Sequence, residues 1–152
     1  MDKKTLMILI VIMAFIIVGI FFILNSNPPI VTENITLKTQ NFEYFEIGTP
    51  EKSNFTIENT ADNMIYYKNN GNYSKDFSGI ILNKGLTDEL LGENNNVILN
   101  GSSEQIYSTS LKNKTIYKIV SVNDNVDIIL TGENLNLLKE VSNTIKIKNK
   151  KL

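Results

Sequence analysis

The sequence contains no cysteine, no histidine and no tryptophan, and all fifteen of its basic residues are lysines, so it has no arginine either. Without cysteine the fold has no disulfide and depends on its apolar core for stability. Without histidine or cysteine the chain cannot build a Ser–His–Asp or Cys–His catalytic site, and it lacks the usual ligands of zinc and copper. These absences predict a protein with no metal centre and no bound cofactor.

The charge of the chain is nearly balanced, with fifteen lysines against sixteen acidic residues and a net charge of −1. Without arginine there is no planar guanidinium group to hold a phosphate through two hydrogen bonds. A net charge near zero also gives no basic field that would attract nucleic acid. The sequence therefore predicts that nucleic acid is not a partner.

The longest apolar run is Leu6–Leu24, nineteen residues without a charge. At ~1.5 Å of rise per residue a helix of this length extends ~28 Å, close to the ~30 Å thickness of the hydrocarbon core of a bilayer. Lys3 and Lys4 precede the run, and lysines beside a first apolar segment are retained in the cytoplasm. We expect a single-pass membrane protein with a cytoplasmic N-terminus and a C-terminal domain outside the cell, whose partner through Leu6–Leu24 is the lipid bilayer.

A cleaved signal peptide is the alternative to a retained anchor, and it requires a shorter apolar region followed by an Ala-x-Ala-like cleavage site. The stretch Asn25-Ser26-Asn27-Pro28-Pro29 has bulky polar residues and prolines in that place, which favours the anchor. Anchoring through an acylated cysteine is excluded, because the chain has none. We expect a cytoplasmic stub and anchor at 1–25, a stiff spacer at 26–30 and one extracytoplasmic α+β domain at 31–152.

Short alternating runs of apolar and polar residues after the spacer predict β-strands. The expected strands are 35–40, 42–47, 54–58, 64–68, 77–82, 97–99, 105–111, 115–122 and 126–131. Gly48-Thr49-Pro50 is expected to stop the second strand, and residues 112–114 and 123–125 are expected to be hairpin loops. For the strands up to residue 82, the natural assembly is a meander of short antiparallel strands.

Two segments carry helical signals instead. Thr87–Gly92 is expected to be a short helix, with Thr87 as its N-terminal cap and Gly92 at its end. Asn134 is a good N-cap for a second helix over 135–143, in which leucines and a valine recur at helical spacing and form one apolar stripe. We expect this C-terminal helix to lie across one face of the antiparallel sheet and cover it, which gives an α+β fold.

The order of these elements resembles a known family. The resemblance depends on the short helix around Asp88–Leu91, the turn Asn100-Gly101, the paired strands 115–122 and 126–131, and the closing stretches Asn134–Leu138 and Thr144–Ile147. Together they resemble small membrane-anchored proteins of methanogenic archaea with a PsbP/Mog1-like domain. The resemblance covers about residues 35–148. It implies a PsbP/Mog1-like fold and a role in assembly or ligand binding, and it implies no catalytic residues.

An aromatic stretch around an Asn-Gly loop is the candidate contact site. Alternation along a strand sends Tyr66 and Tyr67 to opposite faces, so that one ring packs in the core. We expect Tyr67 and Tyr73 to be exposed together and to form a contact site. Exposed aromatic rings suit contact with a sugar or a protein partner. Ordinary packing of these rings within the sheet is the alternative.

The acidic residues offer two further candidates. Asn123–Asp127 presents oxygen ligands suited to Ca²⁺, but Ile128 stands where an EF-hand loop needs glycine, so a hairpin turn is favoured. Asp88, Glu89 and Glu93 have the chemistry of paired carboxylates in a hydrolase. They are favoured instead as acids that complement the positive end of a short helix.

Five Asn-x-Ser/Thr triplets are potential glycosylation sites, at Asn34, Asn54, Asn72, Asn100 and Asn113. The high asparagine content accounts for most of them by chance. From all these patterns we expect a non-catalytic binding or assembly module, anchored in the membrane and facing an envelope polymer or another membrane protein. The alternative is a carboxylate-only hydrolase that acts on an envelope polymer.

Overall fold

The computed structural model describes residues 35–124 and 126–148, apart from the side chain of Asn59. All of these belong to the unit Ile35–Leu152. The expected anchor at Leu6–Leu24 and the expected spacer at 26–30 lie outside the described residues. Within the described ranges, no helix is both long enough and apolar enough to span a bilayer.

The described residues form ten strands and two helices. In chain order they are β1 (Leu37–Asn41), β2 (Phe45–Pro50), β3 (Phe55–Ala61), β4 (Met64–Asn69), β5 (Gly79–Asn83), α2 (Thr87–Leu91), β6 (Asn96–Asn100), β7 (Glu104–Leu111), β8 (Lys114–Ser121), β9 (Asp127–Gly132), α3 (Leu135–Ser142) and β10 (Lys146–Ile147). The expected α+β class, with mostly antiparallel strands and two helices, is therefore confirmed.

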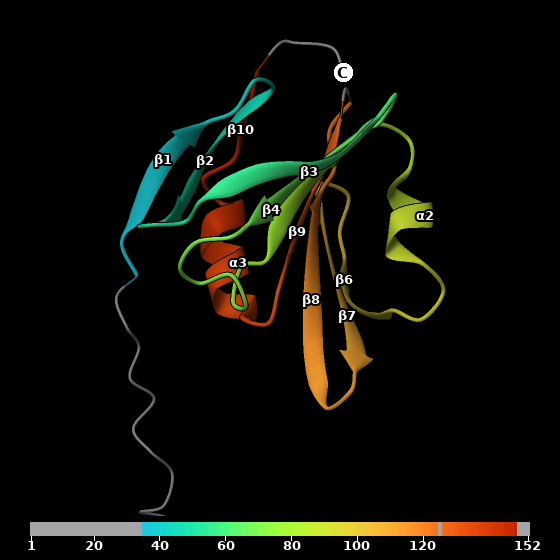
Figure 1. Ribbon diagram of the computed structural model, residues 1–152. Coiled ribbons are helices and arrows are strands. Elements are labelled where there is room, and N and C mark those ends of the chain that lie inside the picture. Colours follow the sequence, from blue (N-terminus) through green and yellow to red (C-terminus); the bar gives the residue numbers. More distant parts are fainter. Residues whose placement is uncertain (1–34, 125, 149–152) are drawn as a thin grey trace, which may run out of the picture. The chain divides into compact units, whose positions relative to one another are not determined.

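The strands form two sheets in which every pair is antiparallel (Figure 1). The smaller sheet has the order β1-β2-β10, and the larger has the order β3-β4-β5-β9-β8-β7-β6. The meander expected for residues 35–82 is present in β3, β4 and β5, but β1 and β2 belong to the other sheet. The chain leaves β5 through α2 and resumes at the opposite edge with β6. It then returns strand by strand until β9 pairs with β5.

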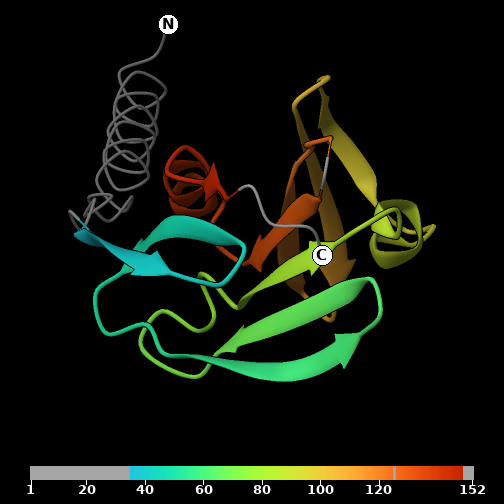
Figure 2. The same cartoon turned by 90° about the horizontal axis from the view of Figure 1, so that it is seen from above.

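The core lies on one face of the seven-stranded sheet. Tyr67, Ile80, Leu130, Ile119 and Ile106 stand opposite one another on five neighbouring strands, and all five are buried. Helix α3 and the β1–β2 hairpin lie on one side of the sheet, while α2 lies on the other (Figures 1 and 2). The sheet is strongly bent, so β3–β4 and β7–β8 diverge in Figure 2.

Helix α3 behaves as its sequence predicts. The side chain of Asn134 accepts a hydrogen bond from the Leu137 backbone N–H at 3.1 Å, which satisfies one free donor of the first turn. Leu138 and Val141 are fully buried, and the helix packs against β2, β8 and β9. The expectation that a C-terminal helix covers one face of the sheet is therefore confirmed.

Strand β2 does not stop at Gly48-Thr49-Pro50, as the sequence predicts, but continues through Pro50. Pro50 lacks an N–H, yet it pairs with Leu37 at the far end of the strand, beyond the two residues that β10 reaches. The Gly48 N–H donates to the Thr144 hydroxyl at 2.7 Å, just after α3. A Cβ at Gly48 would lie 3.0 Å from that hydroxyl, so the small residue permits this approach.

Helix α2 is held at both ends by side chains from the sheet. Thr87 is not its cap: the Leu86 N–H donates to Asn83 Oδ1 at 3.1 Å, while the Thr87 hydroxyl donates to Asp127 Oδ2 at 2.6 Å. At the other end Lys118 Nζ donates to the carbonyl oxygens of Leu90 and Leu91 at 3.2 and 3.0 Å. The helix ends at Gly92, whose φ of 74° suits glycine, as expected.

Candidate functional site

The two tyrosines proposed as a contact site are not exposed together. Alternation does place Tyr66 and Tyr67 on opposite faces of β4, but Tyr67 is the core residue, with 6% of its surface exposed. Its ring lies edge-on to Phe42 and Phe45, with centroids 4.8 and 5.9 Å away. The expectation that Tyr67 is exposed beside Tyr73 is wrong, because the β1–β2 hairpin folds over this end of the sheet and buries it.

Tyr73 lies in the loop that connects β4 to β5 and is half-buried. Its φ of 61° is in the left-handed region, which is uncommon for a residue other than glycine. Its carbonyl oxygen accepts a hydrogen bond from the Phe77 N–H at 2.7 Å, which closes the loop. Tyr73 therefore has a part in shaping this loop, and it does not form a shared exposed surface with Tyr67.

Burial of Tyr67 gives a prediction for alkaline pH. Burial raises the pKa of its phenol above 10.0, and the nearby charges of Glu43 and Tyr44 add to the rise. An unfolded tyrosine loses its proton near pH 10.0 while the buried one keeps it, so unfolding releases a proton. This contribution to the free energy of unfolding is present below that pH and is lost as the pH rises through the folded pKa.

We expect urea midpoints of the parent to fall more steeply than those of Tyr67→Phe between about pH 9 and about pH 11. The pKa of Tyr66 is also raised by burial, so the difference between the two proteins, rather than either slope alone, reports Tyr67. Between about pH 6 and about pH 8 the difference should be constant. If the urea midpoints of the parent and of Tyr67→Phe fell equally steeply at alkaline pH, this would contradict the buried position of the Tyr67 hydroxyl.

The acidic candidates occupy exposed or structural positions. Asp88 and Glu89 lie exposed in the first turn of α2, and Glu93 is exposed just beyond it. A small surface hollow is lined by Lys84, Gly85, Asn123, Asp124, Val126 and Asp127. The Asp127 carboxylate there accepts hydrogen bonds from the Thr87 hydroxyl and from the Asn123 N–H.

Through these two hydrogen bonds Asp127 holds the backbone at Asn123 and the start of helix α2 in place. In the described part of the chain, no three acidic residues gather as a metal site would require.

Four of the potential glycosylation sites can be placed. Asn54, Asn72, Asn100 and Asn113 have exposed side chains, whereas Asn34 lies outside the described residues. Asn54 and Asn72 flank the β3–β4 end of the sheet, Asn113 lies in the β7–β8 hairpin with a φ of 65°, and Asn100 ends strand β6. Glycosylation itself stays a prediction.

The feature that stands out among the described residues is edge strand β6, Asn96–Asn100, which we call the β6 edge. Its residues Val97, Ile98 and Leu99 are 60%, 50% and 45% exposed, three consecutive apolar side chains facing solvent. In the described part of the chain β6 pairs with β7 alone, so its outer backbone groups have no strand partner. An edge strand of this kind is a template for pairing with another strand.

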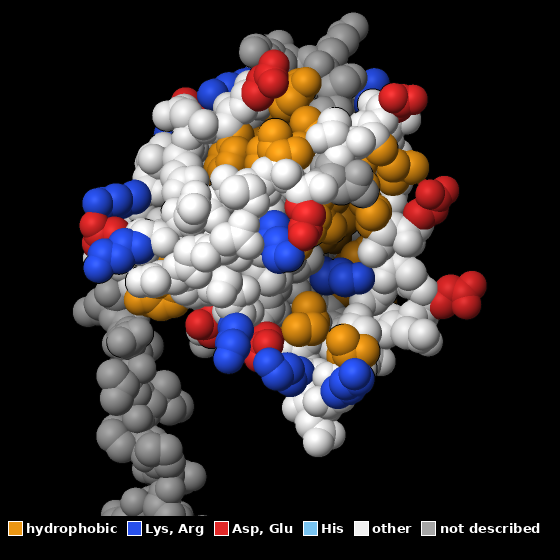
Figure 3. Space-filling view, viewed as in Figure 1, with side chains coloured by type: hydrophobic (Ala, Val, Ile, Leu, Met, Phe, Trp, Pro, Cys, Tyr) orange, Lys and Arg blue, Asp and Glu red, His pale blue; other side chains and the backbone are white. Residues whose placement is uncertain are grey.

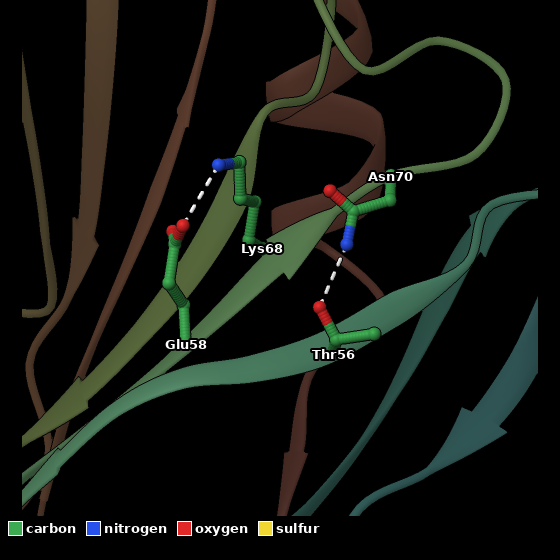
Figure 4. A network of polar contacts seen from close by, with 4 residues as sticks. All are labelled: Thr56, Glu58, Lys68 and Asn70. Carbon is green, nitrogen blue, oxygen red and sulfur yellow. Dashed lines mark hydrogen bonds and ion pairs between the residues drawn. The ribbon is translucent and has the colours of Figure 1, made fainter.

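The two edges of the large sheet differ in how they are protected. Both contain a β-bulge, between Ile57 and Asn59 in β3 and between Val97 and Leu99 in β6. The bulge of β3 contains a charged residue, Glu58, which forms an ion pair with Lys68 at 2.8 Å (Figure 4). The sequence from Asn94 to Ser103 contains no charged residue, so β6 lacks this protection.

The row of buried residues that crosses five neighbouring strands of the large sheet continues onto its two edge strands, where the apolar side chains are exposed. Ile57 stands opposite Tyr67, and Leu99 stands opposite Ile106, so both continue the buried row onto the edge strands. Their side chains are exposed because α3 and the β1–β2 hairpin pack over the middle of the sheet. On the face shown in Figure 3, charged side chains are scattered and much of the surface is uncharged.

Sequence reasoning expected a strand at 97–99 but did not identify it as an edge. The signal available was the ten-residue stretch without charge around three consecutive apolar residues. No protein-family model matches the chain, and no curated protein matches it either.

Proposed function

We propose that this protein is a non-catalytic binding or assembly module, held at a membrane by Leu6–Leu24 and presented outside the cell. The observation that carries the proposal is the β6 edge, with three exposed apolar side chains and outer backbone groups that no described strand pairs. A recruited strand would gain main-chain hydrogen bonds from that edge and apolar contacts from Val97, Ile98 and Leu99.

The sequence and the structure support this proposal in different ways. The length of Leu6–Leu24 and the preceding lysines support the anchor and its orientation. The order of α2, the β8 and β9 pair, α3 and β10 supports the proposed relationship to PsbP/Mog1-like proteins. A domain held close to its membrane meets envelope polymers and other membrane proteins more often than freely diffusing solutes, so we propose partners of those kinds.

The proposal is tested by retention of the full chain, in detergent micelles, on native envelope material. Ile98→Lys places a charge on the β6 edge and should reduce retention by about tenfold, the equivalent of ~1.4 kcal/mol. The matched control is Ile57→Lys, which changes another exposed isoleucine at the opposite edge and should leave retention unchanged.

Circular dichroism should be the same for both variants and the parent, since neither side chain is in the core. Equal retention of Ile98→Lys and the parent would overturn the proposal that the β6 edge is the binding surface.

A further inference from the structure

The β6 edge is self-complementary in its order of residue types. Read in either direction, Asn96–Asn100 begins with an asparagine, continues with three apolar residues and ends with an asparagine. Two copies of one strand related by a two-fold axis pair antiparallel. With the axis near Ile98, the apolar part of one copy meets the apolar part of the other, and each Asn96 lies near the other copy's Asn100.

The absence of charge permits the β6 edge to pair with a second copy of itself. In a two-fold pair any charge near the centre of the strand faces the same charge on its partner, which destabilises the pair. No such charge exists between Asn94 and Ser103. Glu104, the acid that follows this stretch, has turned back into β7, where its carboxylate accepts a hydrogen bond from the Ser142 hydroxyl at 2.9 Å.

The bulge in β6 presents the apolar Ile98, whereas the bulge in β3 presents the charged Glu58. Ile98 has no partner in β7, since the register passes from Val97–Tyr107 to Leu99–Ile106, and its side chain is half exposed. At the other edge the bulged region carries Glu58 and its ion pair with Lys68. The same sheet thus has one edge with a charge in the bulge and one edge that a second copy can approach.

From these observations we infer that the β6 edge pairs with the β6 edge of a second copy of this chain, and joins the two seven-stranded sheets into one. The inference rests on the proposed function and names the partner of its site. A contact through five residues is smaller than the ~800 Å² per partner of a stable complex, so the pair is weak in dilute solution. Confinement of both copies to one membrane raises their effective concentration and makes the pairing significant.

The lack of cysteine in the sequence makes a direct test available, because a single introduced cysteine can form only an intermolecular disulfide. Full chains with Val97→Cys, Ile98→Cys or Leu99→Cys are expressed in their own membrane and oxidised mildly. We expect a disulfide-linked dimer of twice the chain mass, strongest at the residue nearest the two-fold axis. Ile57→Cys is the matched control and should give about tenfold less dimer, since it shares the membrane but lies at the other edge.

Failure of this inference can be told from failure of the proposed function. If no β6 cysteine gives more dimer than Ile57→Cys, the pairing of two copies is wrong. If Ile98→Lys nevertheless loses retention on envelope material, the edge binds a different protein and the proposed function stands. If Ile98→Lys keeps full retention while the β6 cysteines give the dimer, the edge joins two copies and the envelope contact lies elsewhere.

Discussion

Leu138→Asp is expected to unfold the domain. Leu138 is fully buried in α3, where the helix covers the sheet, so the introduced carboxylate would have no access to water and no cationic partner in the apolar core. Loss of the leucine contacts and burial of an unpaired polar group together cost about 4 kcal/mol or more. Natural domains are stable by only about 5–15 kcal/mol. Urea unfolding of a fragment from Ile30 to Leu152, followed by circular dichroism, measures the loss.

The matched control is Asn136→Asp, which adds the same carboxylate to the exposed side of the same helix. Its position in the first turn places the negative charge near the positive helix end, so we expect no loss of stability. If Leu138→Asp were as stable as Asn136→Asp, α3 would not be docked on the sheet through this residue.

Asn69→Asp is expected to have the second largest effect. Asn69 is buried at the end of β4, and its amide is fully used. Its oxygen accepts from the N–H groups of Asn54 and Gly71 at 3.1 and 2.9 Å, and its nitrogen donates to the carbonyl oxygens of Asn72 and Phe77 at 3.1 and 3.0 Å. One side chain thus ties the strand end to the loop that follows it.

An aspartate at this position has nearly the same shape but cannot donate while it is ionised. The carboxylate would face two carbonyl oxygens and leave both without their donor, at a cost of about 3 kcal/mol or more. Asn70→Asp is the control: it alters the neighbouring exposed residue, whose Nδ2 donates one surface hydrogen bond to Thr56 Oγ1 at 2.7 Å (Figure 4), and the Thr56 hydroxyl can donate to the new carboxylate instead. We expect a loss of less than ~1 kcal/mol there.

The pH dependence of Asn69→Asp provides a second readout. Two facing carbonyl oxygens disfavour the ionised form, so the folded pKa of the introduced group lies above its unfolded value of ~3.9. The protonated form regains a donor, and the folded state therefore binds the proton more tightly than the unfolded state does. The urea midpoint of Asn69→Asp should approach that of the parent as the pH falls through this window. If the difference between the urea midpoints of Asn69→Asp and the parent did not narrow, this would argue against the four hydrogen bonds of the Asn69 side chain.

Local signals in the sequence predicted the local structure well. The cap at Asn134 and the apolar stripe of α3 involve residues within a few positions of one another, and the structure has both. Alternation placed Tyr66 and Tyr67 on opposite faces of one strand, but it could not tell which face would be covered. That depends on Phe42 and Phe45, which reach Tyr67 from a different sheet. The β6 edge was missed for a related reason, since an edge is defined by the strands that do not pair with it.

The asparagines that have a structural role could not be identified from the sequence, because asparagine is so frequent in this chain. Asn69 and Asn83 are buried and hold the ends of their strands to the following turns, yet nothing in the sequence separates them from the many exposed asparagines of this chain. Pro50 shows the opposite error, because a residue that usually ends a strand is tolerated where its missing N–H has no partner to lose.

The small sheet joins the two ends of the described chain. Strand β10 pairs with Glu46 and Phe45, and Lys148 Nζ donates to the Phe42 carbonyl oxygen at 2.7 Å, 106 residues away in the chain. At about 5–20 residues per second, a ribosome takes roughly 5–20 s to synthesise the residues between them. During that time the β1–β2 hairpin has left the ribosome, but Phe45 has neither α3 nor β10 beside it. Folding of this domain is therefore completed only after synthesis has passed Lys148, and until then the nascent hairpin presents an apolar surface for chaperones to shield.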